Sequence, residues 1–298
     1  IGLQGIRLLK PTLGETFLVS GLGLIGILAA QLLKFNGCKV LGLDPEKKKC
    51  ELAESFGIKS FQLKDGSDPI DWCLNNTNNI GVDGVLIAAS TKSSEPIDLA
   101  AKVSRVRGRI VLVGVTGIEI KRDLFYKKEL SFQVSCSYGP GRYDPNYEKL
   151  CQDYPIGFVR WTEKRNFEAV LDAFSSKKVS VENLITKYFS LDDAAKAYDF
   201  LLNDYSSLGI VLTYPRNNKL IKKIEISNER SDRNFTVNKH PIVNFIGSGN
   251  YARKILIPSF SKAGAEFNII SSKNGVGPVF VGKKFNFKIA TTNINDIF

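Results

Sequence analysis

The stretch Thr16-Phe17-Leu18-Val19-Ser20-Gly21-Leu22-Gly23-Leu24-Ile25-Gly26 decides the fold of this chain. It opens with a short apolar run that is typical of a buried strand. Three glycines follow with the spacing G-x-G-x-x-G, and residues 24–35 continue as a helical pattern. Glycines at these positions let the backbone turn tightly and approach a pyrophosphate, whose charge then lies at the N-terminus of the helix. We therefore predict a dinucleotide-binding unit, with the pyrophosphate held by Gly21, Gly23, Leu24, Ile25 and Gly26.

A carboxylate follows the second predicted strand, residues 39–43. Asp44 lies about 20 residues after the glycines, where an acid accepts hydrogen bonds from the adenosine ribose hydroxyls and repels a 2′-phosphate. This position predicts NAD in preference to NADP. The alternative is that Asp44 and Pro45 only cap the helix predicted over residues 46–56.

Residues 16–33 contain no charge, so a membrane span is an alternative for them. Three glycines, Ser20 and Gln31 interrupt the stretch, which only just reaches the roughly 18–20 apolar residues that a bilayer requires. We therefore favour the strand–turn–helix interpretation.

Strands and helices alternate along the rest of the first 215 residues. Further strands are predicted over residues 60–63, 82–88, 109–114, 130–137, 185–189 and 209–214, and helices over 68–76, 95–104, 166–175 and 191–203. This alternation predicts an α/β fold with a doubly wound parallel Rossmann sheet. Ala88, Ala89 and Ser90 end the fourth strand, at the crevice where the strand order of such a sheet reverses, so we expect them to line the cofactor site.

Residues 138–166 form a predicted loop rich in Gly, Pro, Tyr and Arg. Long loops inside a compact domain are usually functional, and this one is too aromatic to be disordered. Tyr138, Arg142, Arg160 and Trp161 are therefore candidates for the substrate side of the site. The alternative is ordinary packing, because arginines often stack on aromatic rings.

A second glycine turn begins at residue 247, directly after the apolar run 242–246. A helix over 252–263 and a strand over 266–271 are predicted next. The cofactor contacts expected here are Gly247, Gly249, Asn250, Tyr251, Ala252 and Ser271. Ser271-Ser272-Lys273 stands where the first unit has an acid, which indicates either NADP binding or a plain polar turn.

These patterns divide the chain into three predicted parts: a nucleotide-binding domain with a return segment over residues 1–215, a polar linker over 216–240, and a partial second Rossmann unit over 241–298. The net charge of +11 is concentrated after residue 215, where 14 Lys and Arg face 5 Asp and Glu. A basic segment indicates either nucleic-acid or membrane contact or a solvated linker. We expect neither a nucleic-acid nor a membrane partner, because no basic run with interleaved aromatics appears.

The five cysteines contain no C-x-x-C pair, and His240 is the only histidine. This pattern predicts reduced thiols in a cytoplasmic protein and no metal site, hence no zinc in this chain.

Three segments together resemble the cofactor domain of the medium-chain, zinc-type alcohol dehydrogenases. They are the lead-in of residues 5–15, the glycine turn with Asp44, and the ending Gly209-Ile210-Val211-Leu212. The resemblance covers residues 1 to about 215. It implies that Val113, Gly114 and Val115 lie beside the nicotinamide half of the cofactor.

The second glycine turn resembles the start of the glucose–fructose oxidoreductase and inositol dehydrogenase family. The order of the two units, with the segment 137–145, resembles fused bi-domain oxidoreductases. Both families place their catalytic groups outside this stretch, so we expect the chain to be truncated at both ends and incomplete for catalysis. The chain also contains no Met, which indicates either a fragment or omitted methionines. The sequence assigns no catalytic residue, so the catalytic residues are unknown.

The expected function is that of a nicotinamide-dependent oxidoreductase with a small alcohol or sugar-like substrate. NAD is expected in the first domain, and NADP is an option for the second. Assembly into a homo-oligomer is a further option. The alternative function is a non-catalytic dinucleotide-binding or redox-sensing module.

Overall fold

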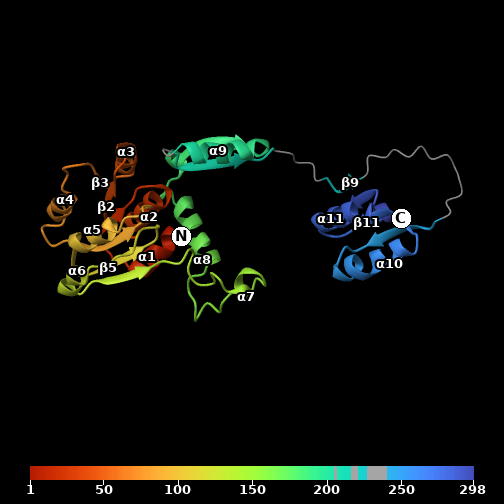
Figure 1. Ribbon diagram of the computed structural model, residues 1–298, viewed down its shortest axis with the longest axis horizontal. Coiled ribbons are helices and arrows are strands. Elements are labelled where there is room, and N and C mark those ends of the chain that lie inside the picture. Colours follow the sequence, from red (N-terminus) through yellow and green to blue (C-terminus); the bar gives the residue numbers. More distant parts are fainter. Residues whose placement is uncertain (205–206, 216–220, 227–239) are drawn as a thin grey trace. The chain divides into compact units, whose positions relative to one another are not determined.

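Figure 1 shows the computed structural model of the protein, which describes residues 1–204, 207–215, 221–226 and 240–298. The chain divides into a first unit, Ile1–Tyr214, and a second unit, Pro215–Phe298. The border falls close to the end of the first predicted domain.

A six-stranded parallel sheet forms the centre of the first unit. Its strands are β1 Thr16–Ser20, β2 Lys39–Asp44, β3 Lys59–Gln62, β4 Val82–Ile87, β5 Ser104–Leu112 and β6 Ser131–Val134. The spatial order is β3-β2-β1-β4-β5-β6, so the strand order reverses between β1 and β4. This is the doubly wound arrangement of dinucleotide-binding folds, and the predicted fold class is confirmed.

Helices cover both faces of this sheet. One face carries α1 Gly2–Leu9, α2 Leu24–Phe35 and α3 Lys47–Ser55, and the other carries α4 Pro69–Asn75, α5 Glu95–Val103 and α6 Arg122–Lys128. Phe17 and Val19 of β1 pack into the first core, whereas Leu18 packs into the second. Successive side chains of a strand point to opposite faces, so one strand supplies two cores.

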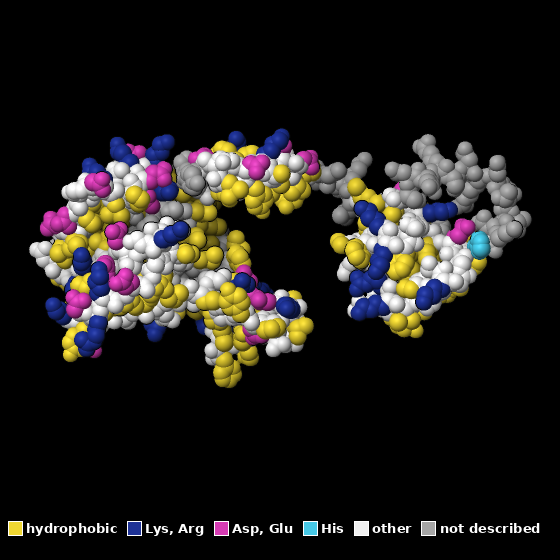
Figure 2. Space-filling view, in the orientation of Figure 1, with side chains coloured by type: hydrophobic (Ala, Val, Ile, Leu, Met, Phe, Trp, Pro, Cys, Tyr) yellow, Lys and Arg dark blue, Asp and Glu magenta, His cyan; other side chains and the backbone are white. Residues whose placement is uncertain are grey.

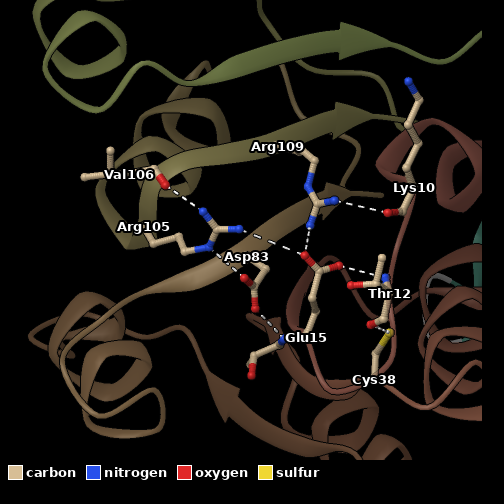
Figure 3. A network of polar contacts seen from close by, with 9 residues as sticks. Lys10, Thr12, Glu15, Cys38, Asp83, Arg105, Val106 and Arg109 are labelled. Carbon is tan, nitrogen blue, oxygen red and sulfur yellow. Dashed lines mark hydrogen bonds and ion pairs between the residues drawn. The ribbon is translucent and has the colours of Figure 1, made fainter.

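A charged network fixes the N-terminal ends of β1, β4 and β5 (Figure 3). Asp83 accepts hydrogen bonds from Arg105 Nε at 2.6 Å and from the backbone N–H of Thr16 at 2.7 Å. Glu15 pairs with Arg109 in the same network. These four side chains are between 16% and 33% exposed, so the pairs are partly shielded from water. The network therefore anchors the end of the sheet opposite to the glycine turn.

The return segment completes the first unit. It contains α7 Pro145–Glu148, α8 Glu163–Ser175, η1 Glu182–Leu184, β7 Ile185–Ser190, η2 Leu191–Asp193, α9 Ala194–Asn203 and β8 Gly209–Thr213. β7 and β8 pair in parallel as a separate two-stranded sheet. Gln31, a buried polar residue of α2, holds this segment through two hydrogen bonds to the backbone of Ser180, at 2.9 and 3.0 Å. The bonds explain why a glutamine lies in an apolar helix face.

Several elements of the first unit differ from the prediction. α7 and the first turn of α8 lie inside residues 138–166, which were predicted as a loop. β5 begins at Ser104, five residues before the predicted start, because its pairing with β4 shifts register between Val82 and Gly84. The residues that cross this irregularity are mostly polar, which hides the strand in the sequence. α6 was not predicted, since Leu124 and Phe125 are the only side chains of this short helix that pack in the core.

The second unit contains β9 Lys223–Glu225, β10 Ile242–Ile246, the π-helix η3 Ala252–Leu256, α10 Ile257–Lys262, β11 Glu266–Ser271, α11 Val276–Phe285, β12 Ile289–Thr291 and η4 Ile294–Ile297. β10, β11 and β12 are parallel neighbours, and β9 pairs with β12 in antiparallel orientation. Phe245, Phe267 and Phe287 form its core, the last two stacked at 4.7 Å between ring centroids.

β9 corrects the predicted linker. Residues 223–225 lie inside the range 216–240 that we expected to be a polar connector, yet they form a strand of the second sheet. The strand is polar and three residues long, so no apolar pattern marks it. Residues 216–220 and 227–239 of that range lie outside the described residues.

The described residues bear on two expectations: the basic charge after residue 215 and the alternative of a membrane span over residues 16–33. The visible face of the second unit carries more Lys and Arg than Asp and Glu (Figure 2). Residues 16–33, the charge-free stretch, form β1, the glycine turn and most of α2. Across the parts of the chain that are described, no helix has both the length and the apolar character needed to cross a membrane.

Candidate functional site

A cleft of about 1120 Å³ opens at the carboxyl ends of the central strands of the first unit. The glycine turn after β1, Asp44 at the end of β2, and residues 88–91 after β4 all line it. This is the point where the strand order reverses, which is where open α/β sheets bind their ligands. The cleft therefore brings together the three separate segments from which we predicted the cofactor site.

Each glycine of the first turn has its own structural reason. Gly21 has φ +95, and a Cβ there would lie 2.6 Å from the backbone nitrogen of Ala89. A Cβ on Gly26 would lie 1.9 Å from the carbonyl oxygen of Gly21, so α2 can approach the turn only without a side chain. A Cβ on Gly23 would meet no described atom within 4 Å. Gly23 thus presents bare backbone to open space, as close contact with a pyrophosphate requires.

The N-terminus of α2 is available for an anion. Gly23 is its N-cap, and among the described residues no side chain caps it. The first N–H groups of a helix have no acceptor within the helix, and the helix dipole favours negative charge there. Leu24, Ile25 and Gly26 form this first turn, and their contact with a pyrophosphate stays a prediction.

Asp44 is held rigidly at the edge of the cleft. Its side chain is 5% exposed and accepts hydrogen bonds from the backbone N–H groups of Leu22 and Glu46, both at 2.8 Å. The bond to Glu46, the N-cap of α3, shows that Asp44 does support the start of that helix. A carboxylate has about four acceptor positions, so two remain for other donors. Asp44 can therefore combine its structural role with acceptance from a ribose diol.

The ends of β4 and β5 hold one another in place. A Cβ on Gly114 would lie 2.1 Å from the carbonyl oxygen of Ala89, and Val115 donates its N–H to that oxygen at 3.1 Å. Ala88, Ala89 and Ser90 line the cleft. Val113, Gly114 and Val115 are not among the described residues that line it. Their placement beside a nicotinamide therefore stays a prediction.

Sequence reasoning missed the outer wall of the cleft. Residues 63–67 after β3 line it, together with Lys49, Lys102 and Lys121. Lys49 is held by Glu46 at 2.8 Å, and Lys121 pairs with Asp98. The only available signal was topological, because the carboxyl end of β3 must lie at the same sheet edge as those of β1 and β2.

The substrate-side candidates lie away from this cleft, among residues that neutralise or cover them. Tyr138 and Arg142 both donate to Glu148 Oε1 at 2.6 Å. The hydrogen bond to Glu148 raises the pKa of Tyr138 to about 12, and the two donors lower the pKa of Glu148. None of Tyr138, Arg142, Arg160 and Trp161 lines the cleft as far as the structure describes it.

Trp161 is enclosed by two guanidinium groups. Arg7 lies 3.3 Å and Arg160 3.9 Å from the ring centroid. Two groups this close to one centroid cannot share a face, so they lie on opposite faces of the indole. Both faces of Trp161 are therefore occupied by the protein itself, as the packing alternative anticipated.

The second glycine turn has open space around its glycines, whereas Ser271 is buried. Gly247 has φ +99, and a Cβ on Gly247 or Gly249 would meet no described atom within 4 Å. Asn250 accepts a hydrogen bond from Arg253 at 2.6 Å, and Tyr251 is 66% exposed. Ser271 is 3% exposed and binds the N–H of Gly247 through its carbonyl oxygen at 2.6 Å. Its buried side chain makes it a structural residue of the turn, and exposed Lys273 follows it.

The first unit is similar in sequence to known dehydrogenases. Residues 25–152 match the family of zinc-binding dehydrogenases. Alcohol dehydrogenase 1 of Pisum sativum is 24% identical over 203 residues, and alcohol dehydrogenase 2 of Solanum lycopersicum is 27% identical over 205. The alignments cover 67% and 66% of this chain and 48% and 47% of those proteins, so the chain spans about half the length of the curated relatives it matches.

Solved structures show the same fold. The 2R,3R-butanediol dehydrogenase from Bacillus subtilis matches with TM-score 0.57 and 22% identity, over 71% of this chain and 54% of that one. A short chain alcohol dehydrogenase of Escherichia coli CFT073, complexed with cofactor NADH, matches with TM-score 0.54 and 22% identity, over 71% and 57% of the two chains. The first unit of this chain thus has an alcohol dehydrogenase-like fold.

The zinc of the family name has no fitting ligand set among the described residues. In those ranges, no three His, Cys, Asp or Glu side chains come together as metal ligands do. Cys38, Cys50 and Cys73 are buried free thiols, and Cys136 and Cys151 are exposed free thiols. We assign none of these side chains to a metal.

Proposed function

We propose that this chain provides the cofactor-binding part of an NAD(H)-dependent oxidoreductase that acts on an alcohol or a sugar-like polyol. One observation carries the proposal: the open backbone at Gly23 and the fixed carboxylate of Asp44 line one cleft at the reversal of strand order. The family match over residues 25–152 supports the reaction class, and the alcohol dehydrogenases among the relatives support the substrate class.

The residues present fit a nicotinamide dinucleotide. The turn of residues 21–26 binds the pyrophosphate through backbone N–H groups, and Asp44 orients the adenosine ribose. Ala88 and Ala89 line the cleft beside the glycine turn, on the side of β4. The bound cofactor supplies the hydride chemistry, and the protein supplies position and charge.

The preference for NAD over NADP follows from the charge of Asp44. The Asp44 carboxylate and the 2′-phosphate of NADP are both negative, and like charges a few ångströms apart repel each other. Removing the charge of Asp44 should therefore weaken the discrimination between NAD and NADP. We expect the full chain to bind NAD at least about 10-fold more tightly than NADP, a difference of roughly 1.4 kcal/mol.

Isothermal titration calorimetry of the full chain with both cofactors tests this preference. Asp44→Asn keeps the shape of the side chain, and it is expected to bring the two affinities within about 3-fold of each other. Asp65→Asn is the matched control, because Asp65 is an exposed carboxylate on the wall of the same cleft. If folded Asp44→Asn keeps the full preference, Asp44 does not contact the ribose.

For the second unit we propose the role of a second oxidoreductase domain, similar to the glucose–fructose oxidoreductase and inositol dehydrogenase family. The open turn at Gly247 and Gly249, followed by parallel β10 and β11, supports this proposal. Lys273 replaces an acid after β11 and favours NADP there. Calorimetry with NADP before and after Gly249→Val tests it: loss of a binding event supports a second site, and an unchanged titration contradicts it.

A further inference from the structure

A second cavity of about 350 Å³ lies away from the cofactor cleft, where α1, the end of α2 and α8 meet. Its lining is mostly apolar, and the polar members are cations and one amide. The apolar members are Leu3, Ile6, Pro11, Leu32, Phe35 and Ala169, and the polar members are Arg7, Lys10 and Asn36. Its volume is at the lower end of the range for small-molecule pockets. None of these residues lines the cofactor cleft.

The charge of this cavity is entirely positive. Arg7 and Lys10 make no ion pair with any residue that the structure describes, and no described Asp or Glu lines the cavity. Lys10 takes part in the neighbouring network only through its carbonyl oxygen, which accepts from Arg109 at 3.1 Å. Figure 3 shows its ammonium group extended away from that network.

Arg7 is the more constrained of the two cations. Its guanidinium lies against Trp161, and Arg160 covers the other face of the ring. Burial and the neighbouring Arg160 lower the pKa of Arg7, and its Nε is buried without a hydrogen-bond partner among the described residues. Cations at the end of α1 also complement the helix dipole, but that role does not require an apolar cavity beside them. An anion in the cavity would relieve the uncompensated charge.

We propose that this cavity binds a small aliphatic carboxylate. Arg7 and Lys10 receive the carboxylate group, and the alkyl chain lies against Leu3, Ile6 and Leu32. A guanidinium with a second cation suits a carboxylate, and the apolar wall suits an alkyl chain. The site is separate from the cofactor cleft and does not depend on the function proposed for that cleft.

Trp161 provides the readout, because its ring touches Arg7 and the chain has only two tryptophans. In the Trp72→Phe variant of the full chain, Trp161 fluorescence is titrated with sodium hexanoate. We expect a saturable change with a dissociation constant of about 1 mM, since a ligand of so few atoms gains little free energy. Hexanol lacks the charge and acetate lacks the chain, so each is expected to bind at least about 10-fold more weakly.

Two substitutions locate the site. Lys10→Gln alters an exposed side chain and is expected to weaken hexanoate at least about 5-fold, and Ala169→Leu fills the cavity and is expected to abolish saturation. Lys48→Gln, an exposed lysine on α3, is the control and leaves hexanoate binding unchanged. Absence of saturation with hexanoate, equal binding of hexanol, or equal loss in Lys48→Gln and Lys10→Gln would overturn the proposal. NADH titration of each variant shows separately that the cofactor cleft is intact.

Discussion

Gly23→Ala should separate cofactor binding from folding. Gly23 has φ −68 and ψ −174, which alanine adopts without strain, and the added Cβ meets no described atom within 4 Å. The unfolded chain loses entropy, which favours folding by about 0.4–1 kcal/mol, whereas alanine is a poorer N-cap than glycine by a similar amount. We therefore expect the free energy of unfolding to change by less than about 0.5 kcal/mol.

The same methyl group occupies the space that a pyrophosphate needs. Losing one charge-assisted hydrogen bond from the backbone costs about 1.5–3 kcal/mol of binding free energy. That loss corresponds to roughly 10- to 150-fold in the dissociation constant of NADH. Calorimetry measures the affinity, and urea denaturation of the same preparation measures the stability.

Substitutions of two other glycines serve as comparisons in this experiment. Gly157→Ala is the matched control, because Gly157 also has open space around its Cβ position and does not line the cleft. It should leave the affinity for NADH unchanged and raise the free energy of unfolding by no more than about 0.4–1 kcal/mol, the entropic effect of replacing a glycine. Gly21→Ala should lose both stability and affinity, since Gly21 has φ +95 and its Cβ would lie 2.6 Å from Ala89 N. If Gly23→Ala binds NADH as tightly as the unaltered chain, the turn does not hold the pyrophosphate.

Two other predictions concern the first unit. Burial raises the pKa of Cys73 to about 12, so at pH 8 it stays a protonated thiol, and iodoacetamide followed by mass spectrometry should modify Cys136 and Cys151 but not Cys73 in the folded chain. Early labelling of Cys73 would contradict its burial. Asp83→Ala removes the partner of both Arg105 and the N–H of Thr16, and should lower the free energy of unfolding by about 1–3 kcal/mol. Glu51→Ala, in an exposed pair, should cost less than about 0.5 kcal/mol in the same urea titration, and equal losses would refute the anchoring role.

The local part of the site was predictable from the sequence. The turn at residues 21–26 and Asp44 depend on a strand, a glycine spacing and a helix that are contiguous in the chain. Such patterns carry their own physical reason, because only glycine tolerates the conformation of Gly21 and the approach of α2 at Gly26. The doubly wound sheet followed from the alternation of apolar strands with helices.

The contacts between distant segments were not predictable in this way. The outer wall of the cleft, residues 63–67 with Lys121, consists of polar loops that no spacing connects. The stacking of Arg7 on Trp161 joins residues that are far apart in the sequence, and no pattern near either residue marks it. β9 is short and polar, so its place beside β12 depends on pairing alone.

A crystal structure of the full chain with NADH tests the central claim most directly. We expect the pyrophosphate over the turn of residues 21–26, and the adenosine ribose hydroxyls within hydrogen-bond distance of Asp44. NADH density found only at the turn of Gly247 and Gly249, or a cleft in the first unit that stays filled with solvent at saturating NADH, would contradict the account.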